Sequence, residues 1–451
     1  MTEISREFQV LAKPAGALCN LECLYCYYLE KGSVYKKENN SGPAVNELTR
    51  KGPAVNELTR KGPACINSES NPQQLPIKMN DRVLEMYIVR HISASAESLI
   101  SFSWHGGEPT MAGIDFFRKV VELQKKHVPA GRKIVNGIQT NGTLFNDEWF
   151  RFLASEKFVV GLSIDGPEEL HDLYRRNKSH DPTFHRVMKT LQSLKNYDIT
   201  FEILCVVHSG NAGNPLGVYR FFRDMGARFM TFLPLVVQES EDRNSIRKCS
   251  VIPEDFGDFM ISIFDEWVEK DIGKIKVQLF EEAARTAFNQ DHTLCIFKET
   301  CGGVPVVEHN GDFYSCDHFV DSDHLVGNIM ETGLDVLLDS EMQKNFGRAK
   351  LNTLPQYCMD CEVRSMCNGE CPKNRFVKTP DGEPGLNYLC KGYRKFFNHC
   401  RPFVNAVAAA WQYQRRSESI APVSNQAITG KVSRNSPCGC GSGKKYKRCC
   451  L

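Results

Sequence analysis

Three cysteines near the amino terminus, Cys19, Cys23 and Cys26, are spaced C-x3-C-x2-C in the stretch CNLECLYCYY. An iron–sulfur cubane normally takes four thiolates, so three ligands on one short loop would leave one iron open. An open iron can bind and reduce a small molecule, and the loop therefore predicts chemistry. A structural zinc site that takes its fourth ligand from elsewhere is the alternative. Tyr25 and Tyr27 flank Cys26 and favour the cluster, because bulky rings can shield it from water.

A larger set of cysteines lies between residues 295 and 390, and its spacings are also those of metal ligands. Eight cysteines are the number that two fully ligated iron–sulfur clusters require. A pair of zinc sites is the alternative, because CxxC pairs suit zinc equally well. Zinc carries no electrons, so the two interpretations differ in chemistry. The eight residues are Cys295, Cys301, Cys316, Cys358, Cys361, Cys367, Cys371 and Cys390.

The last fifteen residues, PCGCGSGKKYKRCCL, contain four more cysteines. Four thiolates suit a closed structural zinc site, and a peptide this short cannot bury a core, so metal would supply its folding energy. The basic residues between 444 and 448 are expected to form a solvated face that helps docking; an acidic protein or a nucleic acid is the alternative partner. The four cysteines are Cys438, Cys440, Cys449 and Cys450.

The composition narrows the class of protein. The 451 residues leave room for a large catalytic domain and a further module, and a net charge of +2 argues against a general nucleic-acid or anionic-membrane surface. No apolar run approaches the ~20 residues of a membrane span, and MTEISREFQV lacks the pattern of a signal peptide. We therefore expect a cytoplasmic protein with no membrane partner and no nucleic acid. Nineteen cysteines would be strange as disulfides in the reducing cytosol, so metal binding is the economical explanation.

The elements that must position these residues alternate short apolar runs with amphipathic stretches from about residue 8 to 290. This alternation predicts parallel βαβ units, and six or so units predict an α/β fold with a partial or complete β/α barrel. Sites in such folds lie at the carboxyl ends of strands, and the first cysteine loop directly follows the first strand. The predicted strands are 8–13, 99–104, 133–139, 158–164, 200–207 and 227–235, and the predicted helices include 81–92, 115–127, 147–157 and 184–197.

The chain divides into four parts. Residues 36–75 interrupt the first part, and because GPAVNELTRK occurs there twice in succession, we interpret them as a polar, flexible insertion enlarged by duplication. The second part contains a predicted hairpin, VPVVEHNGDFYSCDHF, which turns at Asn310-Gly311. The parts are 1–290 (the barrel), 291–412 (the cysteine-rich domain), 413–436 (a polar linker) and 437–451 (the zinc-binding tail).

The stretch CNLECLYC resembles the signature of the radical S-adenosylmethionine (radical SAM) family, and WHGGEPTM resembles its GGEP motif. In that family the open iron chelates SAM, and electron transfer cleaves the sulfonium to methionine and a 5′-deoxyadenosyl radical. Glycines let the backbone approach a ligand closely, and the resemblance implies that Glu108 would fix the methionine ammonium. The resemblance implies that the SAM contacts are Tyr25, Gly107, Glu108, Ser163, Arg175 and Val236.

The eight later cysteines resemble the SPASM domain, an appended module with two auxiliary 4Fe–4S clusters whose ligands interleave. Carried over by position, the first auxiliary cluster would be held by Cys295, Cys301, Cys316 and Cys371, and the second by Cys358, Cys361, Cys367 and Cys390. The tail resembles the zinc-binding SEC-C motif. The implied architecture is a partial (β/α)6 TIM-like radical SAM barrel, a SPASM domain and a zinc tail. The implied cofactors are three 4Fe–4S clusters, SAM and zinc.

Over residues 8–400, apart from the insertion, the chain resembles the anaerobic sulfatase-maturating enzymes, through stretches such as GLSIDGP, YSCDHFV and NGECPKNRF. Those enzymes oxidise one Cys or Ser of an unfolded sulfatase, in a Cys/Ser-x-Pro-x-Arg segment, to Cα-formylglycine. A flavodoxin or ferredoxin is the expected reductant. The implied mechanism begins with abstraction of a hydrogen atom from the substrate Cβ. The substrate then loses its thiol or hydroxyl proton and a second electron. The product is an aldehyde, or a thioaldehyde that hydrolyses to it. The SEC-C tail departs from the usual layout of this family.

Asp317, directly after Cys316, matches the general base proposed for this family. A carboxylate within hydrogen-bond reach of the substrate can accept its proton. The alternative is a hairpin aspartate that stabilises the turn or bonds a backbone amide. The match of YSCDH favours catalysis. The auxiliary clusters nearby would conduct the departing electron.

Two other functions compete with this prediction. The first is another radical SAM/SPASM enzyme that forms thioethers or crosslinks in peptides; such enzymes usually carry a peptide-binding domain ahead of the barrel, and about seven residues precede the first strand here. The second is a non-catalytic metal-binding adaptor, which would contain mainly zinc and would not cleave SAM.

Four further residues receive no catalytic role from the sequence. His105 is expected to pack beside Trp104, and Cys205 is expected in the core because its strand is apolar. Cys249 and Cys400 have no matching partner spacing, so we assign them no ligand role.

Overall fold

The computed structural model describes residues 8–28, 78–239, 245–420, 435 and 443–448. The chain forms two compact units, residues 1–401 and 402–451. The predicted insertion at 36–75 and the four tail cysteines lie outside the described residues. None of the helices in the described ranges combines the length and the apolar character that a bilayer crossing demands.

The first unit is built on a ten-stranded sheet with the strand order β10-β9-β8-β1-β2-β3-β4-β5-β6-β7. The strands from β1 to β7 pair in parallel, and β8 also pairs in parallel with β1, whereas β8, β9 and β10 pair antiparallel with one another. The parallel part is the predicted partial β/α barrel. The strands are β1 (Leu11–Ala12), β2 (Leu99–Trp104), β3 (Lys133–Thr140), β4 (Val159–Ser163), β5 (Phe201–Val207), β6 (Phe229–Pro234), β7 (Lys276–Val277), β8 (Val306–Val307), β9 (Asp312–Tyr314) and β10 (Leu325–Asn328).

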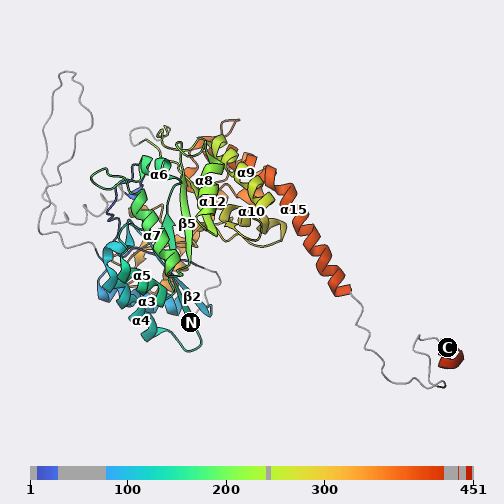
Figure 1. Ribbon diagram of the computed structural model, residues 1–451, viewed down its shortest axis with the longest axis horizontal. Coiled ribbons are helices and arrows are strands. Elements are labelled where there is room, and N and C mark those ends of the chain that lie inside the picture. The colour runs from blue at the N-terminus through green and yellow to red at the C-terminus, as the bar shows by residue number, and fades with distance from the viewer. Residues whose placement is uncertain (1–7, 29–77, 240–244, 421–434, 436–442, 449–451) are drawn as a thin grey trace, which may run out of the picture. The chain divides into compact units, whose positions relative to one another are not determined.

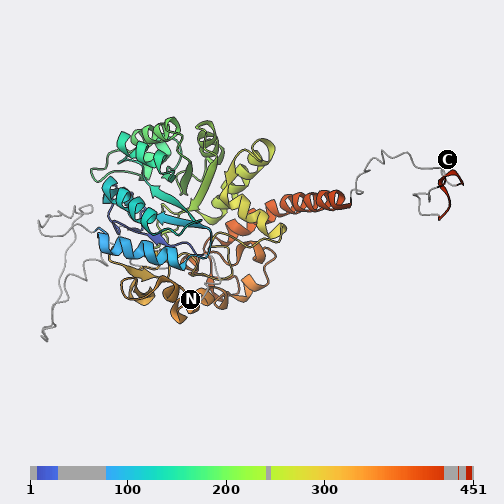
Figure 2. The ribbon, with the colours of Figure 1, turned by 90° about the horizontal axis from the view of Figure 1, so that it is seen from below.

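Helices connect the parallel strands (Figure 1) and lie along the outside of the curved sheet (Figure 2). They are α3 (Asp81–Ala94), α4 (Ile114–His127), α5 (Asp147–Ser155), α6 (Glu168–Tyr174), α7 (Phe184–Asn196), α8 (Pro215–Asp224), α9 (Pro253–Lys270) and α10 (Gln278–Ala287). The cysteine-rich region adds α11 (Leu334–Leu338), α12 (Glu341–Asn352), α13 (Gln356–Met359), α14 (Arg364–Cys367), a small hairpin of β11 (Val377–Lys378) and β12 (Pro384–Leu386), and α15 (Cys390–Ile420).

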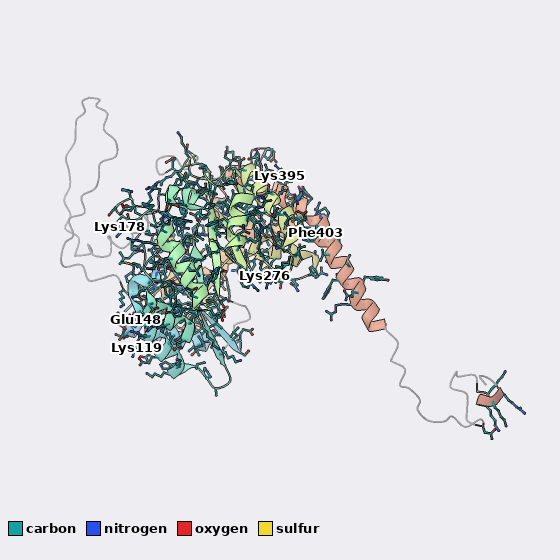
Figure 3. The ribbon with its side chains drawn as sticks, in the orientation of Figure 1. Lys119, Glu148, Lys178, Lys276, Lys395 and Phe403 are labelled. Atoms are coloured by element: carbon teal, nitrogen blue, oxygen red, sulfur yellow. The ribbon has the colours of Figure 1, made fainter. Side chains whose placement is uncertain are left out.

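Local sequence signals explain why these elements form. The first barrel helix begins where the side chain of Asn80 accepts a hydrogen bond from Val83 N at 3.0 Å, which satisfies a backbone donor that the helix leaves unpaired. In β2, Ile100, Phe102 and Trp104 are buried and alternate with more exposed residues, as the two-residue period of a strand requires. Charged side chains lie on the outer face of the first unit. Figure 3 labels five of them: Lys119, Glu148, Lys178, Lys276 and Lys395.

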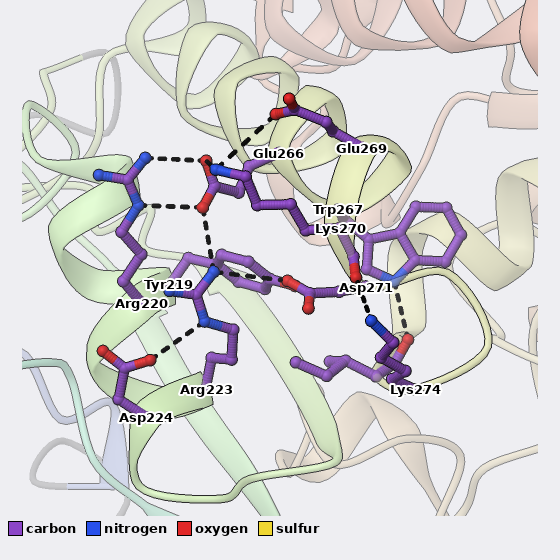
Figure 4. A network of polar contacts seen from close by, with 11 residues as sticks. Tyr219, Arg220, Arg223, Asp224, Glu266, Trp267, Glu269, Lys270, Asp271 and Lys274 are labelled. Atoms are coloured by element: carbon purple, nitrogen blue, oxygen red, sulfur yellow. Dashed lines mark hydrogen bonds and ion pairs between the residues drawn. The ribbon is translucent and has the colours of Figure 1, made fainter.

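A network of charged side chains ties α8 to α9 on the outside of the barrel (Figure 4). Arg220 forms a bidentate contact with Glu266: its Nε donates to Oε1 at 3.0 Å, and one terminal nitrogen donates to Oε2 at 2.8 Å. Arg223 donates to Oε1 of the same carboxylate at 3.0 Å. These hydrogen bonds, Arg220 first, lower the pKa of Glu266 to about 2. The network therefore stabilises the fold above the ordinary carboxylate pKa and loses its effect as the pH falls towards 2.

The structure differs from the sequence expectations at two places. The predicted strand 8–13 shortens to β1, although its backbone continues along the next segment, with Gln9 N bonded to Gly303 O and Lys13 N to Val307 O at 2.8 and 2.9 Å. The predicted linker 413–436 begins inside a helix, because α15 runs to Ile420. Residues 413–420, YQRRSESI, contain neither glycine nor proline and several good helix formers, so nothing in them ends the helix.

The predicted hairpin is present, with β8 and β9 joined through Gly311, whose φ of +92° suits glycine. Because β8 lies beside β1, this hairpin extends the barrel sheet. The cysteine-rich domain is therefore joined to the barrel through shared strand pairing within the first unit.

Candidate active site

Residues that follow successive parallel strands gather at one edge of the sheet. Lys13 follows β1, His105 follows β2, Asn141 follows β3, Asp165 lies two residues after β4, and His208 follows β5. The carboxyl ends of parallel strands meet at the same edge, so these side chains surround one site.

The three-cysteine loop folds over this edge. Leu21, Cys23 and Tyr25 are buried together, and Cys19 and Cys26 pack against them. Burial raises the pKa of Cys19 and of Cys23 to about 11, so these thiols stay protonated until a metal displaces the proton. Three thiols on one buried loop fit the three protein ligands of a cluster with an open iron.

The GGEP turn holds the loop in place through its backbone. Gly107 N donates to Gly16 O at 2.9 Å, and Glu108 N donates to Leu18 O at 2.8 Å. A Cβ atom on Gly107 would lie 2.3 Å from the carbonyl oxygen of Leu18 and 2.4 Å from that of Ala17. Only glycine fits so close to two backbone carbonyls, so Gly107 sets the distance between β2 and the cysteine loop.

Glu108 is fully buried and accepts four hydrogen bonds within the protein. Its Oε1 accepts from the backbone and hydroxyl of Thr110 at 3.1 and 2.6 Å and from the hydroxyl of Thr140 at 2.8 Å, and its Oε2 accepts from Asn141 N at 2.8 Å. Burial raises the pKa of Glu108, while these donors oppose the rise. The carboxylate ties the ends of β2 and β3 together, a function that the sequence motif alone did not indicate.

Asp165 accepts hydrogen bonds from three separate segments of the site, and the sequence did not single it out. It is fully buried; its Oδ2 accepts from Tyr25 OH at 2.5 Å and from Arg175 Nε at 2.8 Å, and its Oδ1 accepts from Val206 N at 2.9 Å. Burial alone would raise the pKa of Asp165, but Arg175 outweighs burial and lowers it. Two predicted SAM contacts, Tyr25 and Arg175, are therefore held by one carboxylate. Its place within LSIDGP, just beyond a strand end, was the available signal.

We expect Asp165→Asn to lower the free energy of unfolding by about 3 kcal/mol, because it leaves the buried Arg175 charge without its partner. The carboxylate has a folded pKa below its usual 3.8, so its contribution is complete above that pH and is lost only as the pH falls through the lower folded value. Anaerobic urea denaturation at pH 7 measures the change. Asp224→Asn, which removes an exposed partner of Arg223, is the control and should change stability by less than about 1 kcal/mol. Equal effects of the two variants would contradict the assignment.

Ser163 and Val236 also lie at strand ends. Ser163 is the last residue of β4, and Val236 lies two residues beyond β6; both are half-buried. These positions agree with the face on which SAM is expected, and their contacts with SAM remain a prediction.

Asp317 comes from the hairpin and faces the cysteine loop. Its Oδ1 lies 2.6 Å from Lys13 Nζ, and its carboxylate accepts from Tyr27 OH at 2.5 Å and from Tyr28 OH at 3.0 and 3.1 Å. Lys13 also lies 3.1 Å from Glu308. Burial alone would lower the pKa of Lys13, but Asp317 and then Glu308 reverse this and raise it. The carboxylate thus contacts the barrel and the cysteine loop as well as its own hairpin, and its catalytic role remains a prediction.

His105 does more than pack beside Trp104. Its Nδ1 lies 3.0 Å from the hydroxyl of Tyr28, which itself donates to Asp317. Cys205 is fully buried in β5, as expected, and Cys249 packs against the cluster of residues around the cysteine loop. Sequence spacing did not reveal the position of His105 because its contact depends on the fold of the loop after β1.

The eight later cysteines are the predicted ligands of the two auxiliary clusters, and their division between the clusters remains a prediction. Four of them line one cavity: Cys358, Cys361, Cys367 and Cys390. In the part of the chain that the structure describes, no three Cys, His, Asp or Glu side chains converge closely enough for a single metal ion. Four thiols around one cavity fit the four protein ligands of a 4Fe–4S cluster.

The other four cysteines influence one another electrostatically. Burial raises the pKa of Cys295 and of Cys301 to about 11; the neighbouring Cys301 adds to the first rise, and Cys316 adds to the second. Burial also raises the pKa of Cys371, with a contribution from Cys316. These four are the predicted ligands of the first auxiliary cluster, and their ligand roles remain a prediction.

We expect the reconstituted protein to hold about twelve irons, as three 4Fe–4S clusters require, and Cys358→Ala with Cys361→Ala to lower this to about eight. Iron and zinc are measured together by mass spectrometry of the metals. Cys400→Ala is the control, because Cys400 is fully buried in α15 away from the cavity lining, and it should leave the iron content unchanged. A wild-type protein that holds zinc and fewer than about twelve irons would contradict the cluster assignment.

The tail is described only in part. Residues Tyr446–Arg448 form a single short helical turn, and Lys444, Lys445, Lys447 and Arg448 are exposed, as expected for a solvated basic face. The zinc prediction concerns cysteines outside the described residues.

Family models match three segments of the chain. Residues 15–216 match the radical SAM superfamily, residues 299–362 match the iron–sulfur cluster-binding SPASM domain, and residues 434–451 match the SEC-C motif. The first two segments contain the cysteine loop and part of the later cysteine set.

Curated relatives and a solved structure resemble nearly the whole chain. A serine-type anaerobic sulfatase-maturating enzyme of Bacteroides thetaiotaomicron is 39% identical over 429 residues, covering 92% of this chain and 95% of the relative. A cysteine-type anaerobic sulfatase-maturating enzyme of Clostridium perfringens is 31% identical, covering 88% of this chain and 98% of the relative. The structure of native anSMEcpe with bound AdoMet and Cp18Cys peptide superposes with a TM-score of 0.74 at 30% identity, covering 90% of this chain and 100% of that chain.

Proposed function

We propose that this chain, which belongs to the family of anaerobic sulfatase-maturating enzymes, oxidises a Cys or Ser side chain of a sulfatase to Cα-formylglycine. The chain is a radical SAM oxidoreductase that uses SAM and iron–sulfur clusters. One observation supports the finer proposal: the carboxylate of Asp317 accepts hydrogen bonds from Tyr27 and Tyr28, the two residues that follow Cys26. The substrate would be an unfolded Cys/Ser-x-Pro-x-Arg segment.

The proposed cofactor ligands follow the grouping described above. Cys19, Cys23 and Cys26 would hold the SAM-binding cluster, and the two groups of four would hold the auxiliary clusters. When bound, these groups would supply one-electron chemistry for abstracting a substrate hydrogen and for accepting the second electron. Tyr25 and Arg175, both fixed by Asp165, and the backbone around Gly107 would shape the SAM site.

Asp317 is proposed as the base that accepts the substrate thiol or hydroxyl proton. The ammonium of Lys13 at 2.6 Å favours the ionised form of a nearby carboxylate, and only the ionised form can accept a proton. The hydroxyls of Tyr27 and Tyr28 fix the direction of the carboxylate by donating to it. Asp317 is 7% exposed, so the proton acceptor is shielded from bulk water.

The remaining partners are proposed on the sequence alone. A flavodoxin or ferredoxin would supply electrons, and the tail would bind zinc through Cys438, Cys440, Cys449 and Cys450. We expect the protein to act in the cytoplasm, with no membrane or nucleic-acid partner.

The experiment is an anaerobic assay of the reconstituted protein with SAM, dithionite and either a Cys-x-Pro-x-Arg or a Ser-x-Pro-x-Arg peptide. Mass spectrometry follows the peptide, and chromatography follows 5′-deoxyadenosine. We expect deoxyadenosine together with an aldehyde-bearing product from at least one peptide, and no product from a peptide with Ala at the target position. Deoxyadenosine with a crosslinked or unchanged peptide would replace formylglycine formation with another radical SAM reaction, and absence of both products would favour the non-catalytic adaptor.

A further inference from the structure

Lys350 is a buried cation at the first group of cysteines. It lies on α12 and is 1% exposed. Its Nζ donates to the carbonyl oxygens of Cys295, Ile296 and Lys298 at 2.9, 2.7 and 2.5 Å. Among the described residues these three carbonyl oxygens are its hydrogen-bond acceptors, as many as a charged ammonium has hydrogens.

The helix that carries Lys350 is fixed against the ligand loop. A Cβ atom on Gly347, one turn earlier, would lie 2.8 Å from the carbonyl oxygen of Cys301, and Cys301 N donates to Gly347 O at 3.1 Å. The backbone of α12 therefore lies directly on the loop that contains two proposed ligands of the first cluster. Movement of the Lys350 charge away from this loop would require the helix to separate from it.

Arg375 is a second cation, and it lies between the two groups. Its guanidinium donates to the carbonyl oxygens of Asn368, Gly369 and Glu370, at 2.9, 2.9 and 3.2 Å. These three residues join Cys367 of the second group to Cys371 of the first. Arg375 also donates to the carbonyl oxygen of Lys350 at 2.5 Å, which links the two cations through the backbone.

Neither cation has a carboxylate partner within ion-pair distance among the described residues. Lys350 is buried and Arg375 is half-buried. A buried charge without a counter-charge is strongly unfavourable, so Lys350 above all needs a nearby negative group. Lys350 Nζ lies 2.9 Å from the carbonyl oxygen of Cys295, and the backbone to which Arg375 donates joins Cys367 to Cys371. Thiolates that carry iron–sulfur clusters would supply this counter-charge permanently.

We propose that Lys350 and Arg375 set the reduction potentials of the two auxiliary clusters, holding them at more positive values so that each accepts an electron more readily. Lys350 acts on the first cluster, and Arg375 acts on both. A cation stabilises the reduced cluster more than the oxidised one, because reduction adds one negative charge. The inference rests on the cluster ligands given under the proposed function and leaves the identity of the peptide product open.

The test is a redox titration of the full chain in which Cys19, Cys23 and Cys26 are replaced by Ala, so that auxiliary clusters alone titrate. Dithionite supplies one electron per cluster, the cluster passes from the 2+ to the 1+ state, and no bond forms or breaks. Electron paramagnetic resonance follows the reduced state without SAM or peptide. We expect Lys350→Met to lower the ratio of reduced to oxidised cluster at a fixed potential about tenfold, which is a shift of about 59 mV for one electron.

Matched variants separate charge from packing. Lys350→Gln keeps hydrogen-bond donors without the charge and should shift the potential as Lys350→Met does. Arg348→Met removes an exposed cation two residues away on the same helix and should shift it little. Arg375→Gln should lower the potentials of both clusters.

The proposal is overturned if Lys350→Gln and Arg375→Gln keep wild-type potentials, or if Arg348→Met shifts them equally. If Lys350→Met loses iron, the reduction potentials of Lys350→Gln and Arg375→Gln decide whether the charges set the potentials. A wild-type protein that shows no auxiliary cluster signal would overturn both this inference and the proposed ligands. Because no peptide is present, failure of formylglycine formation in the separate assay would leave the potentials as an independent result.

Discussion

Asp317→Asn should stop peptide oxidation while SAM cleavage continues. The amide cannot accept the substrate proton, and general bases contribute about 10²- to 10⁴-fold to rate, so we expect formylglycine formation to fall by at least about 100-fold. Hydrogen abstraction precedes proton loss in the proposed sequence, so 5′-deoxyadenosine should still form. The loss of negative charge also leaves Lys13 with Glu308 as its near partner, 3.1 Å away. The measurement is the ratio of aldehyde product to deoxyadenosine in the anaerobic assay.

Asp323→Asn is the matched control for this variant. Asp323 is an exposed aspartate of the same segment, six residues along the chain, and its replacement should leave both products at wild-type levels. Iron content is measured in each variant, because Asp317 adjoins a proposed cluster ligand. Wild-type oxidation by Asp317→Asn with full iron content would show that Asp317 only connects the hairpin to the barrel.

Gly107→Ala should strongly reduce both peptide oxidation and SAM cleavage, including SAM cleavage in the absence of peptide. The new Cβ would meet two backbone carbonyls at 2.3 and 2.4 Å, and backbone cannot turn aside as a flexible side chain can. Either the cysteine loop or the end of β2 must shift, and a displacement of about 1 Å at an active site can cost about 100-fold in rate. Overpacking of this kind also costs about 1–3 kcal/mol of stability. Deoxyadenosine formation and thermal unfolding together measure the two effects.

Gly213→Ala provides the control for Gly107→Ala. A Cβ atom on Gly213 would meet nothing within 4 Å, so this variant should retain activity and stability. Full deoxyadenosine formation by Gly107→Ala would mean that the loop tolerates displacement from β2, and the role of Gly107 as a spacer would then be wrong.

The barrel strands were predictable because burial imposes a regular pattern on them. The stretch 99–104 matches β2 residue for residue, and the predicted strand 133–139 differs from β3 only at its end. The strand β1 has only two paired residues, so its alternation of buried and exposed side chains is too short to define its bounds. Its length depends on pairing with β2 and β8, which are distant in sequence. The helical stretch 413–420 was missed because polarity was interpreted as a linker, although its residues have good helix propensity.

The site was predictable where chemistry depends on spacing and not where it depends on tertiary contacts. Cysteine spacing indicated that these residues are metal ligands, whereas their division between two clusters came from the family resemblance and stays a prediction. Lys13 and Asp165 were not singled out, since each acts through a buried ion pair formed with a residue on another strand or loop. A lysine at the end of an apolar strand has no spacing signature of its own. Burial is what makes its charge significant, and burial follows from the pairing of β1 with both β2 and β8.

The contact between Tyr28 and Asp317 spans 289 residues, and this has a consequence for biosynthesis. At about 5–20 residues per second, a ribosome would take about 15–60 s to travel from one residue to the other. During that time the cysteine loop can leave the ribosome without its proposed base, because β8 and β9 have not been made. We expect a nascent chain to assemble its oxidising site only near the end of translation of the first unit. The order of synthesis would thereby keep peptide oxidation, which needs the proposed base, from incomplete chains.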